Sequence, residues 1–160
     1  MALREDRKIN HSEVNYQLND VAAPGVFLCF KTAGSGSAEG DNQGVVQLAS
    51  SPSGLTPCGV LLQNFVSIDT TKYHENWHKE EQVVGTNCQF ATDGWVVTNM
   101  ISGTPTLGAK AYLTTNGNVT PTKSATGGLA ATPYVGEFQG IKDEAGYVKV
   151  AFKLPNSSNA

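Results

Sequence analysis

Charge is scarce in this sequence. Only 16% of its 160 residues are charged, and the formal net charge is -3, whereas a typical globular domain has about 25% charged residues. A surface that binds a polyanion is therefore not expected. The longest apolar stretch, residues 26–30, is far below the roughly 18 to 20 residues of a membrane span. The first residues also lack the apolar region of a secretory signal. We expect no nucleic acid and no membrane as partner, and folding in a reducing compartment.

Paired cysteines are also missing. Cys29, Cys58 and Cys88 are odd in number, far apart and without a C-x-x-C spacing. Neither a disulfide framework nor a thiolate zinc site is therefore indicated. Cys29 lies within the apolar stretch 26–30, where a free cysteine usually behaves as a small buried hydrophobic residue.

The helix-favouring residues Leu and Met are few, while Val, Ile and Thr are abundant and there are 17 glycines. This composition favours strands, and the length fits one domain. We predict an all-β fold, a small β-sandwich or β-barrel, in which Trp95 and Tyr147 belong to the core. The predicted strands cover residues 26–32, 45–49, 59–68, 89–91, 95–101, 109–114, 118–122, 134–141 and 147–154.

Local patterns sharpen this prediction at three places. Asn116-Gly117 and Asp93-Gly94 are dipeptides typical of tight hairpins. Residues 147–154 alternate strictly, which predicts a strand with one apolar face and one face carrying lysines. Two segments depart from the strand pattern: residues 33–44 predict a loop rich in Gly and Ser, and residues 69–81 predict either a short helix or a loop.

The first segment of the chain is dense in charge and poor in apolar residues. We predict a flexible N-terminal arm over residues 1–23, a β-rich domain over residues 24–155 and a disordered tail over residues 156–160. The arm has four apolar positions that are candidates for binding a partner: Ile9, Val14, Tyr16 and Leu18. In contrast, residues 82–136 are almost free of charge, so they either form a surface covered by other protein or are solvated by Ser, Thr and Asn.

One motif suggests metal chemistry. His74, Glu75 and His78 form an H-E-x-x-H pattern, which on a helix places two histidines as zinc ligands and the glutamate as a base. The charged residues 79–81 and Gly85 do not continue such a helix. We therefore expect a solvated or interface loop and no metal or other cofactor, with a zinc metallohydrolase as the alternative.

Short motifs in a distinctive order run through the second half of the chain. They are Gly94-Trp95-Val96-Val97-Thr98-Asn99, Gly103-Thr104-Pro105-Thr106, Ala111-Tyr112-Leu113-Thr114-Thr115-Asn116-Gly117-Asn118-Val119-Thr120-Pro121, Val135-Gly136-Glu137-Phe138 and Gly146-Tyr147-Val148-Lys149-Val150. With these motifs, residues 24–155 resemble the head decoration, or capsid cement, proteins of tailed bacteriophages. Residues 76–79 look similar to that family too.

The resemblance implies a small β-rich, β-tulip-like protein on the outer surface of an icosahedral phage head, where it cements neighbouring capsomers. The implied partners are the major capsid protein and further copies of this chain, as a homotrimer. The implied location is the virion, after synthesis in the host cytoplasm. No catalytic residue or cofactor comes with the family, so no enzyme activity is expected. A tail or fibre protein is the structural alternative.

Overall fold

The computed structural model describes residues 2–31, 44–62, 84–85, 87–124 and 132–154. These residues form nine strands and one short 3-10 helix, so the predicted all-β fold is confirmed. The strands are β1 (Leu3–Leu18), β2 (Phe27–Phe30), β3 (Gly44–Gln47), β4 (Pro57–Leu62), β5 (Asn87–Thr98), β6 (Lys110–Leu113), β7 (Val119–Thr120), β8 (Tyr134–Phe138) and β9 (Val148–Lys153), and η1 is Thr115–Gly117. None of the described segments is a helix of the length and apolarity needed to cross a membrane.

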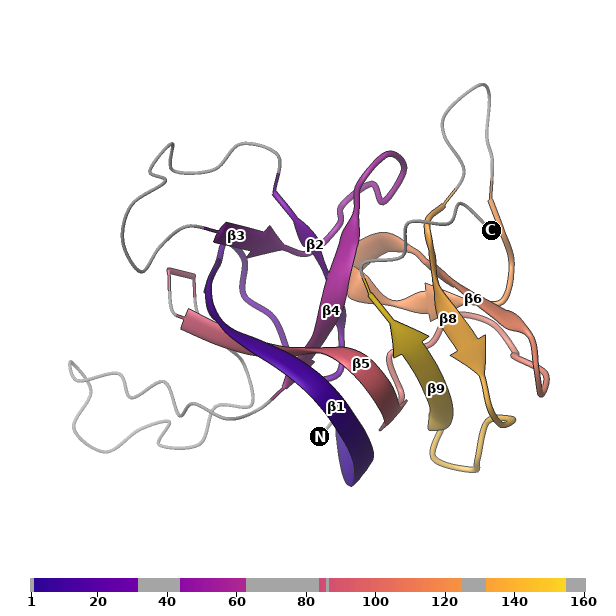
Figure 1. Ribbon diagram of the computed structural model, residues 1–160. Coiled ribbons are helices and arrows are strands. Elements are labelled where there is room, and N and C mark those ends of the chain that lie inside the picture. The colour runs from indigo at the N-terminus through magenta and orange to yellow at the C-terminus, as the bar shows by residue number, and fades with distance from the viewer. Residues whose placement is uncertain (1, 32–43, 63–83, 86, 125–131, 155–160) are drawn as a thin grey trace, which may run out of the picture.

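Five strands close into a barrel (Figure 1). Their order is β1-β3-β2-β4-β5, and the barrel closes because β5 also pairs with β1. One apolar cluster is built from these strands and the segment between β1 and β2: Leu18, Ala22, Val26, Leu28, Val46, Cys58, Leu61, Cys88 and Phe90.

The second half of β5 extends the same nine-stranded sheet beyond the barrel, in the order β5-β9-β8-β6-β7, and this part is called the second sheet below. The last strand of this sheet returns to the first, since Val119 of β7 forms a parallel bridge with Ile101, which follows the end of β5. The apolar residues of the second sheet form a second cluster with residues of β2 and β4, and the rings of Phe27 and Phe152 meet at 5.7 Å between centroids. All six residues of β4 are buried, because apolar packing covers both of its faces.

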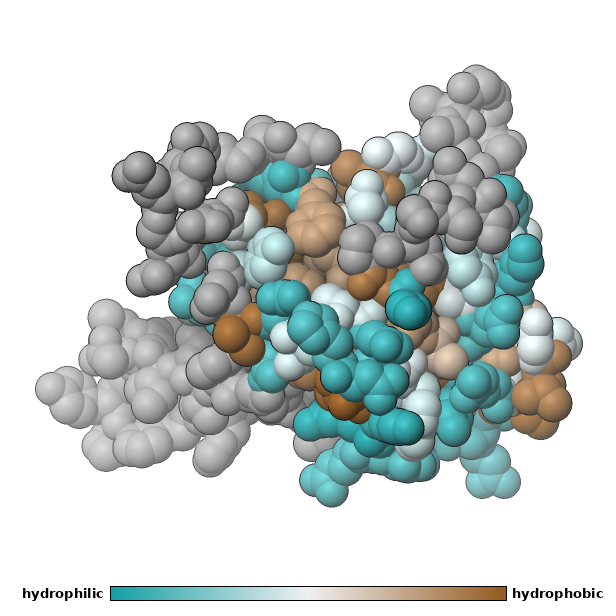
Figure 2. Space-filling view, in the orientation of Figure 1, coloured by the Kyte–Doolittle hydropathy of each residue, from teal (hydrophilic) through white to brown (hydrophobic). Residues whose placement is uncertain are grey.

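The strand β1 corrects the prediction of a flexible arm. Residues 3–18 form a continuous strand that pairs with β5 along its length and with β3 at its end. Leu3 and Leu18 are buried, while the charged residues between them lie largely outward (Figure 2). The buried hydroxyl of Thr98 donates toward the carbonyls of Ala2 or Gly25. The segment therefore completes the barrel and shares its core.

The turn predicted at Asp93-Gly94 is also wrong, because both residues lie inside β5. Gly94 has a φ of 140°, and a Cβ there would meet the carbonyl oxygen of Lys8 at 2.0 Å. The glycine thus serves a close approach of two strands, next to an irregularity in β1 between Ile9 and His11. A glycine within a strand commonly marks such a position.

Two other local predictions are confirmed. Asn116 (φ 59°) and Gly117 (φ 73°) turn the chain between β6 and β7, which pair antiparallel. In β9, Val148, Val150 and Phe152 are buried and Lys149 and Lys153 face outward, as the alternation predicts. The predicted loop 33–44 lies almost wholly outside the described residues, as do residues 63–68 of one predicted strand, residues 69–81 and the tail 156–160.

We predict that Gly94→Ala lowers the free energy of unfolding by about 2 to 4 kcal/mol, since alanine both disfavours the positive φ and collides with β1. The matched control is Gly140→Ala, because a Cβ at Gly140 meets no atom within 4 Å. The control is expected to change stability by less than about 0.5 kcal/mol in urea unfolding. Equal effects of the two changes would contradict the close approach at Gly94.

A second pair of variants tests whether β1 belongs to the core. Leu18 is 1% exposed, whereas Leu107 is 73% exposed. Removing a buried leucine side chain costs about 2 to 5 kcal/mol, so Leu18→Ala is expected to unfold at a much lower denaturant concentration. Leu107→Ala makes the same chemical change at the surface and is expected to stay within about 0.5 kcal/mol of the parent. A small effect of Leu18→Ala on stability would instead support the prediction of a flexible N-terminal arm.

Candidate functional site

The candidate zinc ligands lie outside the described residues. This applies to His74, Glu75 and His78. Within the part of the chain that the structure describes, no group of three or more His, Cys, Asp or Glu side chains is arranged to hold a metal ion. The metal alternative therefore gains no support from the described strands.

The four residues predicted to bind a partner lie on β1 and have different surroundings. Leu18 is fully buried in the barrel, and Ile9 packs against the second cluster. The ring of Tyr16 lies between Phe30 and Phe90, at centroid distances of 5.7 and 5.1 Å. Val14 is 41% exposed. Three of the four thus pack within the chain itself, and only Val14 remains largely accessible to a partner.

The three cysteines are free and buried, which confirms the burial predicted for Cys29 and extends it to Cys58 and Cys88. Burial raises the pKa of the Cys29 and Cys88 thiols to about 12 in each case. Burial also raises the pKa of Cys58 well above its usual value. These thiols are neutral at physiological pH and are poor nucleophiles or metal ligands.

Trp95 and Tyr147, which were predicted to belong to the core, are only partly buried. The ammonium of Lys149 is 3.8 Å from the ring centroid of Trp95. The guanidinium of Arg4 is 4.2 Å from the ring of Tyr147 and also forms an ion pair of 2.8 Å with Asp143. The first contact joins β9 to β5, and the others join β1 to the segment before β9. Each cation–π contact contributes about 0.5 to 1 kcal/mol at an exposed site.

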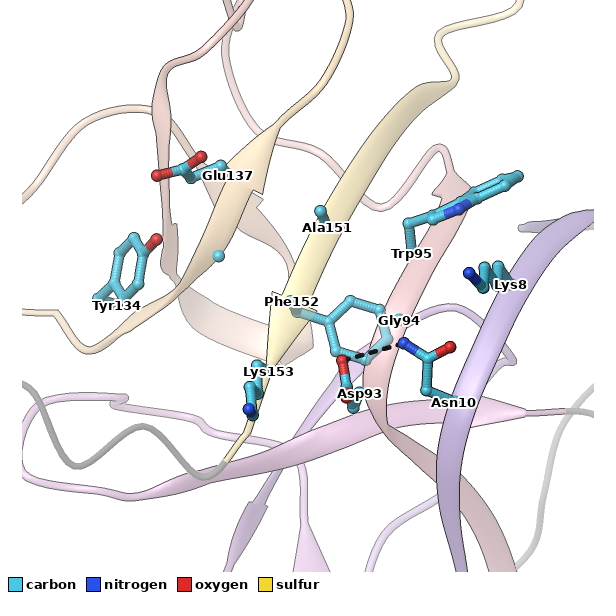
Figure 3. A pocket seen from close by; sticks show the side chains of 11 residues that line it. Lys8, Asn10, Asp93, Gly94, Trp95, Tyr134, Glu137, Ala151, Phe152 and Lys153 are labelled. Carbon is cyan, nitrogen blue, oxygen red and sulfur yellow. Dashed lines mark hydrogen bonds between the residues drawn. The ribbon is translucent and has the colours of Figure 1, made fainter.

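An open hollow lies beside these residues, across the outward face of β1, β5, β9 and β8 (Figure 3). Its volume is about 390 Å³. One row of the sheet beneath it joins Gly94, Phe152 and Gly136. Phe152 is buried in the core, and side chains in one row of a sheet point to the same face. This row therefore puts no side chain on the outward face.

The neighbouring row bounds one side of the hollow. Register places Lys8 beside Trp95, Trp95 beside Ala151 and Ala151 beside Glu137. Ala151 contributes only a methyl group between two large side chains (Figure 3). This short residue keeps the middle of the face open.

The other side carries polar groups from four strands. The amide of Asn10 donates to the carboxylate of Asp93 at 3.4 Å, and Lys153 pairs in register with Asp93. Tyr134 stands near Glu137 on β8 (Figure 3). Burial, the charge of Glu137 and a hydrogen bond with it raise the pKa of the Tyr134 hydroxyl.

The hollow was not predicted from the sequence, because its residues come from four strands that pair far apart in the chain. A local signal did exist in β9. The outward positions of its alternation are occupied by Lys149, Ala151 and Lys153, and the small residue between two long ones indicates a depression on that face. Nothing local indicated that Gly94 and Gly136 lie beside it.

A scan of the chain against models of protein families finds no match, and a search among curated proteins finds none.

We predict that the native protein reacts slowly with Ellman's reagent at pH 8 and that unfolding exposes all three thiols. Unfolded thiols lose their protons near pH 9, while Cys29 and Cys88 keep theirs to about pH 12. The free energy of unfolding is therefore expected to fall as pH rises from about 9 to about 12, by about 1.4 kcal/mol per pH unit for each thiol. Cys29→Ala should make this slope shallower. Fast labelling of the native protein would contradict the burial.

Proposed function

We propose that this chain is a non-enzymatic structural protein of a tailed-phage virion, which binds the outer surface of the head and cements neighbouring capsomers. The observation that carries the proposal is where the family-like motifs lie. Four of the five fall on the second half of β5 and on β6, β7, β8 and β9, and residues 103–106 lie between β5 and β6. These strands are consecutive neighbours in one sheet. Motifs that coincide with one structural unit favour a shared fold over scattered chance similarity.

The proposed partners are the major capsid protein and two further copies of this chain. The charge-poor stretch 82–136 supports them less than the sequence alone indicated, because many of its residues are buried in the chain's own core. Among these are Ala91, Val96, Ala111, Leu113, Val119 and Val135. The resemblance is therefore the main support for a trimer.

A contact surface with the shell is best sought at one end of the second sheet. Leu107 and Ile141 are 73% and 71% exposed. Both flank the β6–β8 pair at the same end, since Gly108 donates its backbone N–H to the carbonyl of Phe138. Exposed apolar side chains that lie near each other are typical of protein interaction sites.

The proposal predicts that the protein copurifies with gradient-banded virions in a copy number comparable to that of the major capsid protein. Cryo-electron microscopy of the particle should then show it on the outer surface of the head. Density in the tail or fibres would instead assign it to the structural alternative. Its absence from purified particles would overturn a virion role.

Particles stripped of the protein allow a sharper test of the contact surface. Ile141→Glu is expected to weaken rebinding at least about tenfold, since an interface would bury the new charge without a partner. The control is Val21→Glu, which introduces the same charge at an apolar residue that is 49% exposed elsewhere. Equal binding of both variants would exclude this end of the sheet as the contact.

A further inference from the structure

We propose that the hollow over β1, β5, β9 and β8 binds a neutral saccharide. The inference is independent of attachment to a phage head, because it rests on the side chains of the hollow alone. Its volume of about 390 Å³ lies within the usual range of small-molecule sites. Its wide opening suits a ligand that remains attached to a larger glycan.

The charges of the hollow are balanced. Lys8 and Lys153 bring two positive charges, and Asp93 and Glu137 bring two negative charges. An anion such as phosphate would be attracted by the lysines and repelled by the carboxylates, and a polyamine would experience the reverse. A neutral ligand avoids both penalties and can still bond to each group.

Hydroxyl groups match this set of side chains. Carboxylates only accept hydrogen bonds and ammonium groups only donate them, whereas a hydroxyl does both. A sugar that presents several adjacent hydroxyls can therefore donate to Asp93 and Glu137 and accept from Lys8 and Lys153. The amide of Asn10 can add a donor or an acceptor.

The floor and one wall suit the apolar side of a sugar ring. Ala151 offers a methyl group at the centre, and Tyr134 offers an aromatic surface at one side (Figure 3). The negative face of an aromatic ring attracts the polarised C–H groups of a sugar. Both rings have a lysine over one face, since the Lys149 ammonium lies 3.8 Å from the centroid of Trp95 and the Lys110 ammonium lies 5.8 Å from that of Tyr134. Tyr134 is the less closely covered ring and therefore the better platform.

An extended peptide fits the hollow less well. Strand addition requires free backbone N–H and C=O groups at a sheet edge. Beneath the hollow, β5 pairs with β1 and β9, and β8 pairs with β9 and β6. The backbone of β5, β9 and β8 is therefore already paired on both sides. The second edge of β1 is open beside Lys8 and Asn10 among the described strands, but its charges and register shifts disfavour strand addition.

Saturation-transfer NMR on the full chain tests the proposal with maltotriose, mannotriose, chitotriose and galactotriose as probes. At least one is expected to receive saturation from the parent protein. Ala151→Leu fills the hollow and should weaken that binding at least about tenfold in a titration. Ala145→Leu makes the same change in an exposed turn and should leave binding unchanged.

A second variant pair covers the possibility that Ala151→Leu disturbs the sheet. Glu137→Gln removes one carboxylate charge at an exposed position, and Glu144→Gln does so outside the hollow. Only the former is expected to weaken binding. The proposal fails if no saccharide receives saturation, if binding persists unchanged in both hollow variants, or if inorganic phosphate or spermidine binds at these residues and the sugars do not.

Discussion

The architecture depends on one strand that belongs to two sheets. The first half of β5 pairs with β4 within the barrel, and its second half pairs with β9 in the second sheet. Throughout its length β5 also pairs with β1 on the other edge. Its partner changes from β4 to β9 between Ala91 and Asp93. Directly after this change, Gly94 allows the backbone of β1 to approach closely.

The register of the strands accounts for the hollow. A side chain at Gly94 would collide with β1, and one at Gly136 would meet the carbonyl oxygen of Ala151 at 2.0 Å, so both positions lack side chains for reasons of backbone packing. Their register partner Phe152 points into the core, and the row adds no side chain to the outward face. The hollow is thus left by an inward-facing row together with the short residue Ala151 in the next row.

Patterns within single segments predicted much of the fold. The alternation in residues 147–154, the Asn116-Gly117 turn and the buried cysteines all reflect interactions between near neighbours or an intrinsic preference for burial. The role of β1 depends instead on pairing between distant residues: Asn10 and Asp93 are 83 positions apart. A charged segment looks unable to fold alone, and its order comes from a partner strand that local composition does not reveal.

The structure also bears on which part of the chain would make the proposed contact with a shell. On its second edge β1 pairs with β3 only from Tyr16 to Leu18, so among the described strands its earlier residues form an edge without a second partner. That edge is rich in charge and shows several register shifts against β5, features by which proteins discourage further strand pairing. Addition of a capsid strand along β1 is therefore disfavoured. For the attachment proposed above, the exposed side chains of Leu107 and Ile141 beside the β6–β8 pair are the better candidates. Many copies of such a modest contact would suffice to hold the protein on a shell.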